Sequence, residues 1–301
     1  MTKRAVVAGI NDYRNWNSVG FGNLSWCLTD AQSFAEDVLV HGRGFRPDDI
    51  TVLLDRDATR TNILEHLRRL LARADLGDVI CLYFSGHGDR AQVPGTPSEW
   101  HETIVPYDGA AMISDHEINA LIAGLEFNRL NLTLVLDSCH SGGVYDPAPP
   151  QGSKVAQWGE DKLGALVSTC KTILPTICAQ TVDPFVNNIQ AILRAVDSAT
   201  MTVDGAKDTA ETAKATLFSA CDFDETAKEN PTLRHGFMTK ALLDTVTQSA
   251  FKMPNRLLAS DLRGKVAAFV SQFGTSQQTP CLRGRPVRQD EDFLTEWTFS
   301  I

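Results

Sequence analysis

The sequence contains none of the short motifs that mark a metal finger or a nucleotide-binding loop. Its seven cysteines are an odd number and no two of them form a CxxC pair, so we expect neither a disulfide framework nor a zinc site. No GxGxxG, GxxxxGKS or GxxxxGKT run is present, which makes a nucleotide-binding domain a remote alternative. Uninterrupted apolar runs are far shorter than the roughly 20 residues that cross a bilayer.

Positive charge is also scarce, because 28 Lys and Arg stand against 37 Asp and Glu and give a formal net charge of -9. Such a chain repels phosphate backbones and acidic lipids, so we expect neither nucleic acid nor membrane as a partner. The N-terminus enters a strand-like run without the apolar stretch of a signal peptide, which predicts a cytoplasmic protein. With 43% hydrophobic and 22% charged residues among 301, the chain has the composition of a globular protein with a sizeable core.

Apolar, strand-like runs alternate with segments whose apolar residues recur at helical spacing. The runs lie at residues 5–10, 51–54, 79–84 and 132–136. Helices are predicted over residues 31–39, after a cap at Thr61, and after a capping box of Ser114 and Glu117. This alternation predicts an α/β fold with a mainly parallel sheet covered on both faces, whose ligands bind at the carboxyl ends of the strands.

A proline-rich stretch at residues 146–154 interrupts this pattern. Two short helices and a polar segment are predicted beyond it, and the pattern resumes with a strand, two helices and a last strand. These lie at residues 216–220, at 236–251, after a cap at Ser260, and at 294–299. We therefore divide one domain into a large part (1–145), an insertion or linker (146–214) and a small part (215–301).

Two predicted strands end in reactive residues flanked by glycine. One run reads Tyr-Phe-Ser-Gly-His-Gly over residues 83–88, and the other reads Asp-Ser-Cys-His-Ser-Gly-Gly over 137–143. A thiolate nucleophile needs an imidazole that takes its proton and backbone N–H groups that bind the oxyanion of the substrate. An arbitrary Cys or His is more often a core or surface residue, but glycines weaken regular structure and argue for a site here.

The paired motifs closely resemble those of metacaspases and other bacterial caspase-like peptidases. The resemblance implies a caspase-like α/β/α sandwich with a six-stranded sheet, and it makes Cys139 the nucleophile and His87 the general base and acid. The backbone N–H groups of Gly88 and Cys139 would bind the oxyanion. The implied activity is that of a cysteine endopeptidase, and a non-catalytic caspase-like scaffold is the alternative.

The resemblance also implies an acidic pocket for the P1 residue, the substrate residue before the cleaved bond. Its members would be Cys27, Asp30, Ser85 and Asp137. Two carboxylates in such a pocket pair with guanidinium or ammonium, so the protein substrates should have Arg or Lys at P1. A helix N-cap is the alternative role for Asp30, and a small buried hydrophobe the alternative for Cys27.

Many members of the resembled family bind activating calcium through carboxylates, and this chain departs from that pattern. His101 and His116 stand where the family has carboxylates, and imidazole is a poor calcium ligand. We therefore expect no cofactor and little response to calcium. A site completed by Glu99, Glu102 and Asp115 is the alternative.

The insertion directly follows the motif of the expected nucleophile, where a cut would free loops close to the substrate cleft. Lys154, Lys207 and Lys214 are candidate processing sites within it. The sequence and the resemblance together predict a zymogen that is cut within 146–214 by itself or by an upstream protease. An uncut insertion that only decorates the surface is the alternative.

Overall fold

A six-stranded sheet forms the centre of the computed structural model, which describes residues 1–92, 100–123, 130–139, 215–222, 225–247, 252–284 and 286–296. Its strands are β1 (Lys3–Gly9), β2 (Ile50–Leu54), β3 (Val79–Ser85), β7 (Asn131–Asp137), β8 (Thr216–Ser219) and β11 (Cys281–Arg283). They are ordered β11-β8-β7-β3-β1-β2, and every neighbouring pair is parallel except β11 with β8. The predicted α/β fold with a mainly parallel sheet is confirmed.

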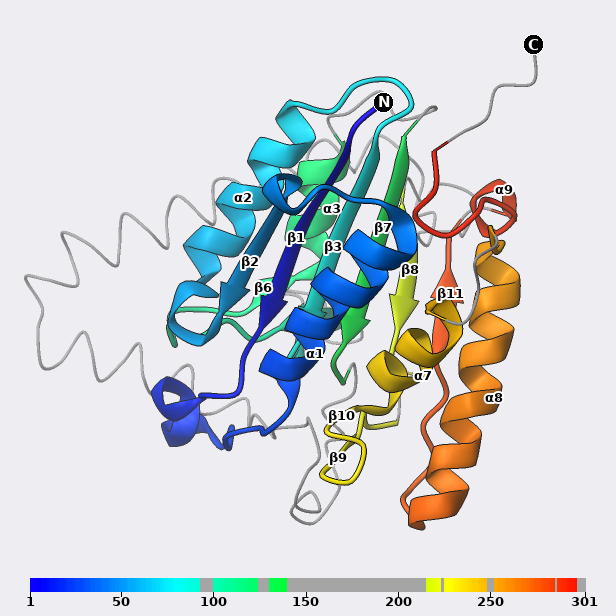
Figure 1. Cartoon of the computed structure of the whole chain (residues 1–301). Coiled ribbons are helices and arrows are strands. Elements are labelled where there is room, and N and C mark those ends of the chain that lie inside the picture. Colours follow the sequence, from blue (N-terminus) through cyan, green and yellow to red (C-terminus); the bar gives the residue numbers. More distant parts are fainter. Residues whose placement is uncertain are drawn as a thin grey trace, which may run out of the picture. The chain divides into compact units, whose positions relative to one another are not determined.

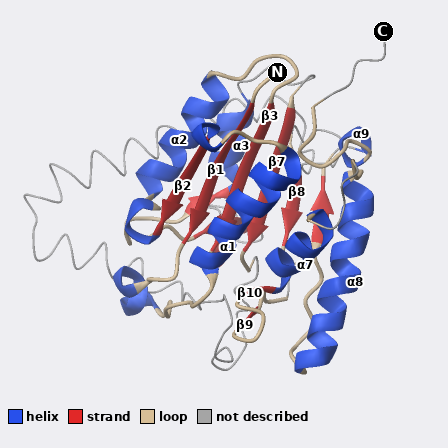
Figure 2. Ribbon diagram, in the orientation of Figure 1, coloured by secondary structure: helices blue, strands red, loops and turns tan. Residues whose placement is uncertain are grey.

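Helices cover both faces of this sheet (Figures 1 and 2). On the face toward the viewer lie α1 (Cys27–Ser33), its continuation as a π-helix η2 (Phe34–Gly42), and α7 (Phe237–Val246), which packs against α8 (Asn255–Phe273). Helix α3 (Asp115–Ala123) lies behind the sheet and contacts α2 (Arg60–Ala72). The short helix α9 (Pro286–Gln289) follows β11. Among the described residues, no helix is both long and apolar enough to cross a membrane.

Short strands form part of the segments that follow β3 and β8. Directly after β3, the strands β4 (Gly88–Gln92), β5 (Trp100–Ile104) and β6 (Ile113–Ser114) form an antiparallel sheet. After β8, β9 (Glu229–Asn230) pairs with β10 (His235–Gly236), which leads into α7. All these strands belong to one compact unit formed by residues 1–157 and 210–301. The predicted insertion 146–214 lies outside the described residues.

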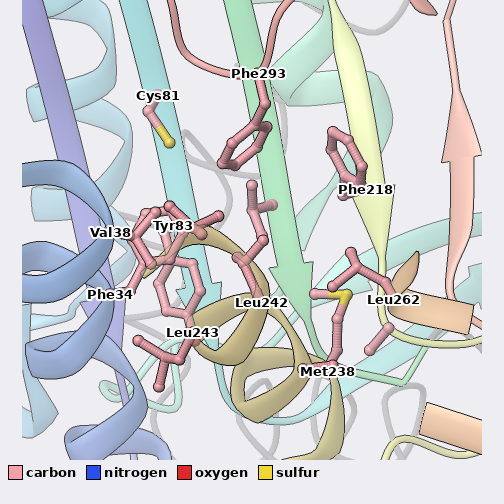
Figure 3. Close-up of a cluster of buried hydrophobic side chains, with 14 of the residues drawn as sticks. Phe34, Val38, Cys81, Tyr83, Phe218, Met238, Leu242, Leu243, Leu262 and Phe293 are labelled. Atoms are coloured by element: carbon pink, nitrogen blue, oxygen red, sulfur yellow. The ribbon is translucent and has the colours of Figure 1, made fainter. Parts of the chain in front are cut away.

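Every residue of β3 and β7 is buried, because these strands lie inside the sheet and are covered from both sides. Side chains alternate between the two faces, so odd-numbered residues of β3 such as Cys81 and Tyr83 face α1 and α7. There they meet Phe34, Leu242 and other apolar side chains of the helices (Figure 3). The same two-residue period places the polar residue that ends each strand on this face.

Helix starts were the least accurate part of the prediction. The capping box is confirmed, since Glu117 N–H donates to Ser114 Oγ at 3.2 Å and Ser114 N–H donates to the Glu117 carboxylate at 3.1 Å. The cap at Thr61 is wrong, because Thr59 caps α2 by accepting from Asn62 N–H. The cap at Ser260 is also wrong, because α8 begins at Asn255 with Pro254 as its N-cap, and Ser260 lies inside the helix.

The last predicted strand, at 294–299, is wrong over the part that the structure describes. Leu294 has a φ of 53°, a left-handed conformation that no strand uses, and Thr295 N–H turns back to Asp292 O. Residues 297–301 lie outside the described residues. The sixth strand is instead β11, three residues long, which is too short to show a period in the sequence.

Asp78 fastens the amino end of β1 to the start of β3. Its carboxylate accepts from Thr2 N–H at 2.6 Å, from Asp75 N–H at 3.1 Å and from the Arg4 guanidinium at 2.8 Å. Burial alone would raise the pKa of Asp78, but these donors outweigh it and hold the pKa below its usual range. The ionised carboxylate therefore stabilises the folded state.

We expect Asp78→Asn to lower the free energy of unfolding by about 1–3 kcal/mol at pH 7, because it leaves buried donors without a charged acceptor. A carboxylate with a lowered folded pKa stabilises the fold above its unfolded pKa of about 3.9, and this contribution is lost as the pH falls through the folded pKa. Urea unfolding at pH 7 and pH 3 checks this, and the difference from wild type should shrink at pH 3. The exposed Asp48 supplies the control Asp48→Asn. Equal losses in both variants would contradict the assignment.

Candidate active site

The two motifs meet where β3 and β7 end side by side. The strands are parallel and in register, with Ser85 opposite Asp137, so His87 and Cys139 each follow two residues beyond this pair. Gly86 N–H donates to Asp137 O, and a side-chain carbon on Gly88 would collide with the carbonyl oxygen of Cys139. Glycine at 88 therefore lets the two strand ends approach as far as backbone contact. The structure brings His87, Gly88 and Cys139 together.

His87 is fixed at its backbone and at its ring. Its N–H donates to the Tyr13 hydroxyl at 2.8 Å, and its carbonyl accepts from Val105 N–H at 3.0 Å. Ring atom Nε2 lies 2.7 Å from the carbonyl oxygen of Gly22, in the loop between β1 and α1. The residue His87 is buried, with an exposed fraction of 2%. Its ring packs edge-on against Tyr13 and Phe21.

The contact with Gly22 decides which nitrogen of His87 carries the proton. A carbonyl oxygen only accepts hydrogen bonds, so Nε2 must be the protonated nitrogen of the neutral ring. Nδ1 then has the lone pair and can take a proton. In known catalytic triads, a carboxylate fixes the tautomer of the histidine in the same way.

The Cys139 thiol is fully buried. Ala227 N–H donates to its Sγ at 3.0 Å, and the Ala227 carbonyl oxygen lies 3.7 Å from the same atom. The loop after β8 that carries Ala227 is held by Gln278, which donates to Ala220 O and accepts from Lys228 N–H. The structure thus shows the thiol under the loop after β8.

The other described cysteines differ in their surroundings. Burial raises the pKa of the Cys81 thiol, which keeps this core residue of β3 protonated. Cys281 on β11 is half-buried, and burial raises the pKa of its thiol as well. Cys170 and Cys178 lie outside the described residues.

Asp30 and Ser85 of the predicted pocket are in direct contact. Ser85 Oγ donates to Asp30 Oδ2 at 2.9 Å, and the fully buried Asp30 carboxylate also accepts from Gly236 N–H at 3.1 Å. His235 Nδ1 lies 2.9 Å from Asp30 Oδ1. Asp30 is the fourth residue of α1, whose N-cap is Trp26, so the alternative role as the cap of its own helix is excluded. Its carboxylate accepts instead from the N–H of Gly236, the N-cap of α7.

Asp137 faces the same helix from the end of β7. It is fully buried, and its Oδ2 accepts from Thr239 N–H at 3.1 Å and from Thr239 Oγ1 at 2.5 Å. The hydroxyl of Tyr83 lies 2.6 Å from Thr239 Oγ1. Both carboxylates therefore bind one short segment, residues 235–239, at the start of α7. Carboxylates are stabilised at a helix N-terminus, because the N–H groups of the first turn have no acceptor within the helix.

Cys27 is buried in the first turn of α1, three residues before Asp30, and its N–H donates to Asn11 Oδ1 at 2.8 Å. Glu229 on β9 accepts from Ser25 and Trp26 N–H at the start of this helix. The amino ends of α1 and α7 are thus tied to each other by acidic side chains that cross between the large and small parts.

Sequence reasoning missed the residues that contact the predicted ones. Gly22, Ala227, His235 and Thr239 were not assigned to the site. Their partners are separated by 65 to 205 residues along the chain, so no local pattern points to them. A carbonyl and an amide of the backbone, as at Gly22 and Ala227, also have no sequence signature.

Several predicted residues lie outside the described part of the chain. These are the processing candidates Lys154, Lys207 and Lys214, together with Glu99 and the side chains of His101 and His116. The processing and calcium assignments stay predictions.

A parallel sheet with His and Cys at the ends of neighbouring central strands defines a caspase-like peptidase domain. Residues 2–290 match the family model of the caspase domain of peptidase family C14, so the chain belongs to this family. A protein from Geobacter sulfurreducens of known crystal structure shares the fold, with a TM-score of 0.65 and 20% sequence identity over 99% of this chain and 100% of that one.

Metacaspases are among the curated relatives. Metacaspase-4 of Arabidopsis thaliana is 35% identical over 173 residues, which is 54% of this chain and 39% of the relative. Metacaspase-1 of Mycosarcoma maydis is 34% identical over 154 residues, or 48% of this chain and 37% of the relative. Each match thus spans less than half of the relative's length.

Proposed function

We propose that this protein is a cysteine endopeptidase that cleaves proteins after Arg or Lys with Cys139 and His87. The observation that carries the proposal is the Gly22 contact, which leaves Nδ1 of His87 as the basic nitrogen beside the motif of Cys139. The resemblance of both motifs to those of metacaspases supports the same roles. An imidazole held in one tautomer next to a thiol is the arrangement that activates a cysteine nucleophile.

The reaction divides into two halves. Nδ1 of His87 takes the Cys139 proton, Sγ attacks the scissile carbonyl carbon, and backbone N–H groups of Gly88 and Cys139 bind the oxyanion. The tetrahedral intermediate collapses, the C–N bond breaks, and the imidazolium of His87 gives its proton to the leaving amine. Water, deprotonated by His87, then attacks the thioester, and the carboxylic acid leaves as the thiol is restored.

The acidic group at the start of α7 supports the preference for a basic P1 residue. The Asp30 carboxylate contacts Ser85 at the end of β3, and Asp137 is the last residue of β7. Both carboxylates therefore lie near the strand ends where the reactive motifs begin. A P1 guanidinium or ammonium that reaches this group exchanges its water for charge-assisted hydrogen bonds. Protein and peptide substrates are the partners that follow, and we assign no nucleic acid or membrane partner.

A covalent probe tests the proposal directly. Once the linker 146–214 has been cut, a peptidyl acyloxymethyl ketone with Arg at P1 should alkylate Cys139, because Sγ displaces the carboxylate only when the thiol is activated. Mass spectrometry of the digested protein identifies the modified residue, and Cys139→Ala is the matched control. Labelling spread evenly over several cysteines, or none at all, would instead favour a non-catalytic scaffold.

The buried state of the site supports a zymogen. Cys139, Asp30 and Asp137 are all fully buried, and Ala227 lies on the thiol, so a substrate binds only after the loop after β8 moves. The linker 146–214 connects the Cys139 motif to β8, the strand that precedes this loop. We propose that cleavage of the linker, by the protein itself or by an upstream protease, releases the loop.

We expect the intact chain to be weakly active and to gain activity when it is cut at Lys154, Lys207 or Lys214. The pieces should stay associated, since β8 pairs with β7 and Thr239 binds Asp137. Time-resolved mass spectrometry of wild type and Cys139→Ala shows whether the cut is autocatalytic, and replacing the three lysines by alanine should block it. Full activity from a chain that stays uncut would contradict the zymogen.

Millimolar calcium is expected to change the activity less than about twofold, because imidazole replaces carboxylates at two positions of the family's calcium pattern. The proposed enzyme needs no cofactor, and we place its action in the cytoplasm. Titration of calcium into chelator-treated protein, with magnesium as the matched control, checks the expectation. A rise of about tenfold or more would mean that oxygen ligands such as Glu102 and Asp115 complete a site.

A further inference from the structure

Tyr13 is a fully buried side chain between β1 and α1 that contacts His87 in two ways. Its hydroxyl accepts from His87 N–H at 2.8 Å and donates to the Val105 carbonyl at 3.3 Å. Its ring lies edge-on to the imidazole, with 4.4 Å between ring centroids. Val105 N–H in turn donates to the His87 carbonyl at 3.0 Å. Tyr13 and Val105 thus hold both backbone groups of His87.

The same hydroxyl occupies the space beside Gly86. A side-chain carbon at position 86 would collide with the Tyr13 oxygen and would lie 2.8 Å from the Phe84 ring. The glycine before His87 therefore makes room for the phenol. The Tyr13 hydroxyl thus lies against the backbone of Gly86 and His87, which sets the direction of the imidazole. This contact is more specific than the packing of an ordinary core side chain.

Tyr13 is also linked to the residue that fixes the tautomer. Tyr13 N–H donates to Asn23 Oδ1 at 2.8 Å, and Asn23 directly follows Gly22, whose carbonyl oxygen lies 2.7 Å from Nε2 of His87. Phe21, on the other side of Gly22, packs against both the Tyr13 ring and the imidazole. A single residue therefore joins the backbone of His87 to the loop that orients its ring.

We infer that Tyr13 is a positioning residue for His87: its hydroxyl and ring hold the imidazole on the Gly22 carbonyl, with Nδ1 as the basic nitrogen. This inference rests on the proposed peptidase function for its kinetic consequence, but not for its structural one. Loss of the hydroxyl leaves His87 N–H without that acceptor and loosens the ring. Misplacement of a catalytic base lowers turnover more than substrate binding, because proton transfer needs a specific geometry.

The test compares Tyr13→Phe with Trp16→Phe. Trp16 Nε1 donates to Pro106 O at 2.6 Å, so this control removes a buried hydrogen bond of the same loop and leaves the contacts of His87 in place. We expect Tyr13→Phe to lower kcat about tenfold or more on an Arg-P1 reporter with KM within about twofold. Trp16→Phe should keep kcat within about twofold of wild type.

Nitrogen-15 NMR of histidine-labelled protein gives a readout that does not need activity. With signals assigned through His87→Gln, neutral His87 in wild type and in Trp16→Phe should show a pyrrole-type Nε2 and a pyridine-type Nδ1. In Tyr13→Phe the two signals should move toward each other as the tautomers mix. Absence of cleavage by linker-cut wild type would defeat the proposed function, whereas the spectra would still decide the role of Tyr13.

Equal kcat values and equal His87 spectra in the two phenylalanine variants would overturn the inference and leave Tyr13 as a core residue. If Tyr13→Phe does not fold, 3-fluorotyrosine at position 13 keeps the ring and hydroxyl but weakens the oxygen as an acceptor. This variant should then show partial mixing of the tautomers and a smaller loss of kcat. Wild-type spectra and wild-type kcat in the fluorinated protein would also overturn the inference.

Discussion

Alanine at position 139 or at position 87 is expected to abolish peptide cleavage, with a loss of kcat of about a thousandfold or more. Cys139 supplies the electron pair that attacks the carbonyl, and His87 takes and returns the proton. Both halves of the reaction therefore need both residues. The double variant should be no worse than either single one, because the two residues act as one unit.

The measurement is kcat/KM on a fluorogenic Arg-P1 peptide after the linker has been cut. Two matched controls use residues of the same types away from the site: Cys281→Ala, on β11, and His41→Ala, at the exposed end of η2. Both should retain nearly full activity, and a serine-protease inhibitor should have no effect. More than a few per cent of wild-type turnover in Cys139→Ala or His87→Ala would refute the dyad.

Asparagine at position 30 or 137 is expected to lower kcat/KM for Arg-P1 substrates about 30-fold or more, which corresponds to roughly 2 kcal/mol. Each change keeps the shape of a fully buried side chain but removes a negative charge next to the expected P1 site. Without that charge, a desolvated guanidinium loses its counter-ion.

Both aspartates also hold the start of α7, so a general loss of activity must be separated from a loss of charge recognition. We therefore compare Arg with citrulline, its neutral isostere, at P1. A structural defect lowers both rates alike, whereas loss of the counter-ion lowers the Arg-to-citrulline ratio. Asp244→Asn, later in α7, is the control for this helix and should leave the ratio unchanged. An unchanged ratio in Asp30→Asn and Asp137→Asn, or comparable cleavage after Asp, would contradict the pocket.

Long buried strands were predictable because they show their pattern locally. β3 is apolar from Val79 to Phe84 and β7 from Leu134 to Leu136, and motifs that contain glycine follow both runs. The capping box at Ser114 was equally visible, since both partners lie three residues apart. The short strand β11 and the true start of α8 depend on contacts with distant elements, and they could not be read from a local window.

The candidate site shows the same division. His87 and Cys139 stand in compact motifs, but the groups that orient and cover them are backbone atoms of Gly22 and Ala227. The link between Asp30 and His235 spans 205 residues and arises only when α1 packs beside the start of α7. Tyr13 has an ordinary appearance in the sequence, and only the position of its hydroxyl at His87 N–H gives it a role.

Digestion of a peptide library of random sequence, followed by sequencing of the new ends, tests the central proposal most directly. The linker-cut protein should produce ends that follow Arg or Lys almost without exception, and the same digestion with Cys139→Ala should produce none. Ends that follow Asp, ends without preference at P1, or equal cleavage by Cys139→Ala would contradict a Cys139 peptidase with an acidic pocket.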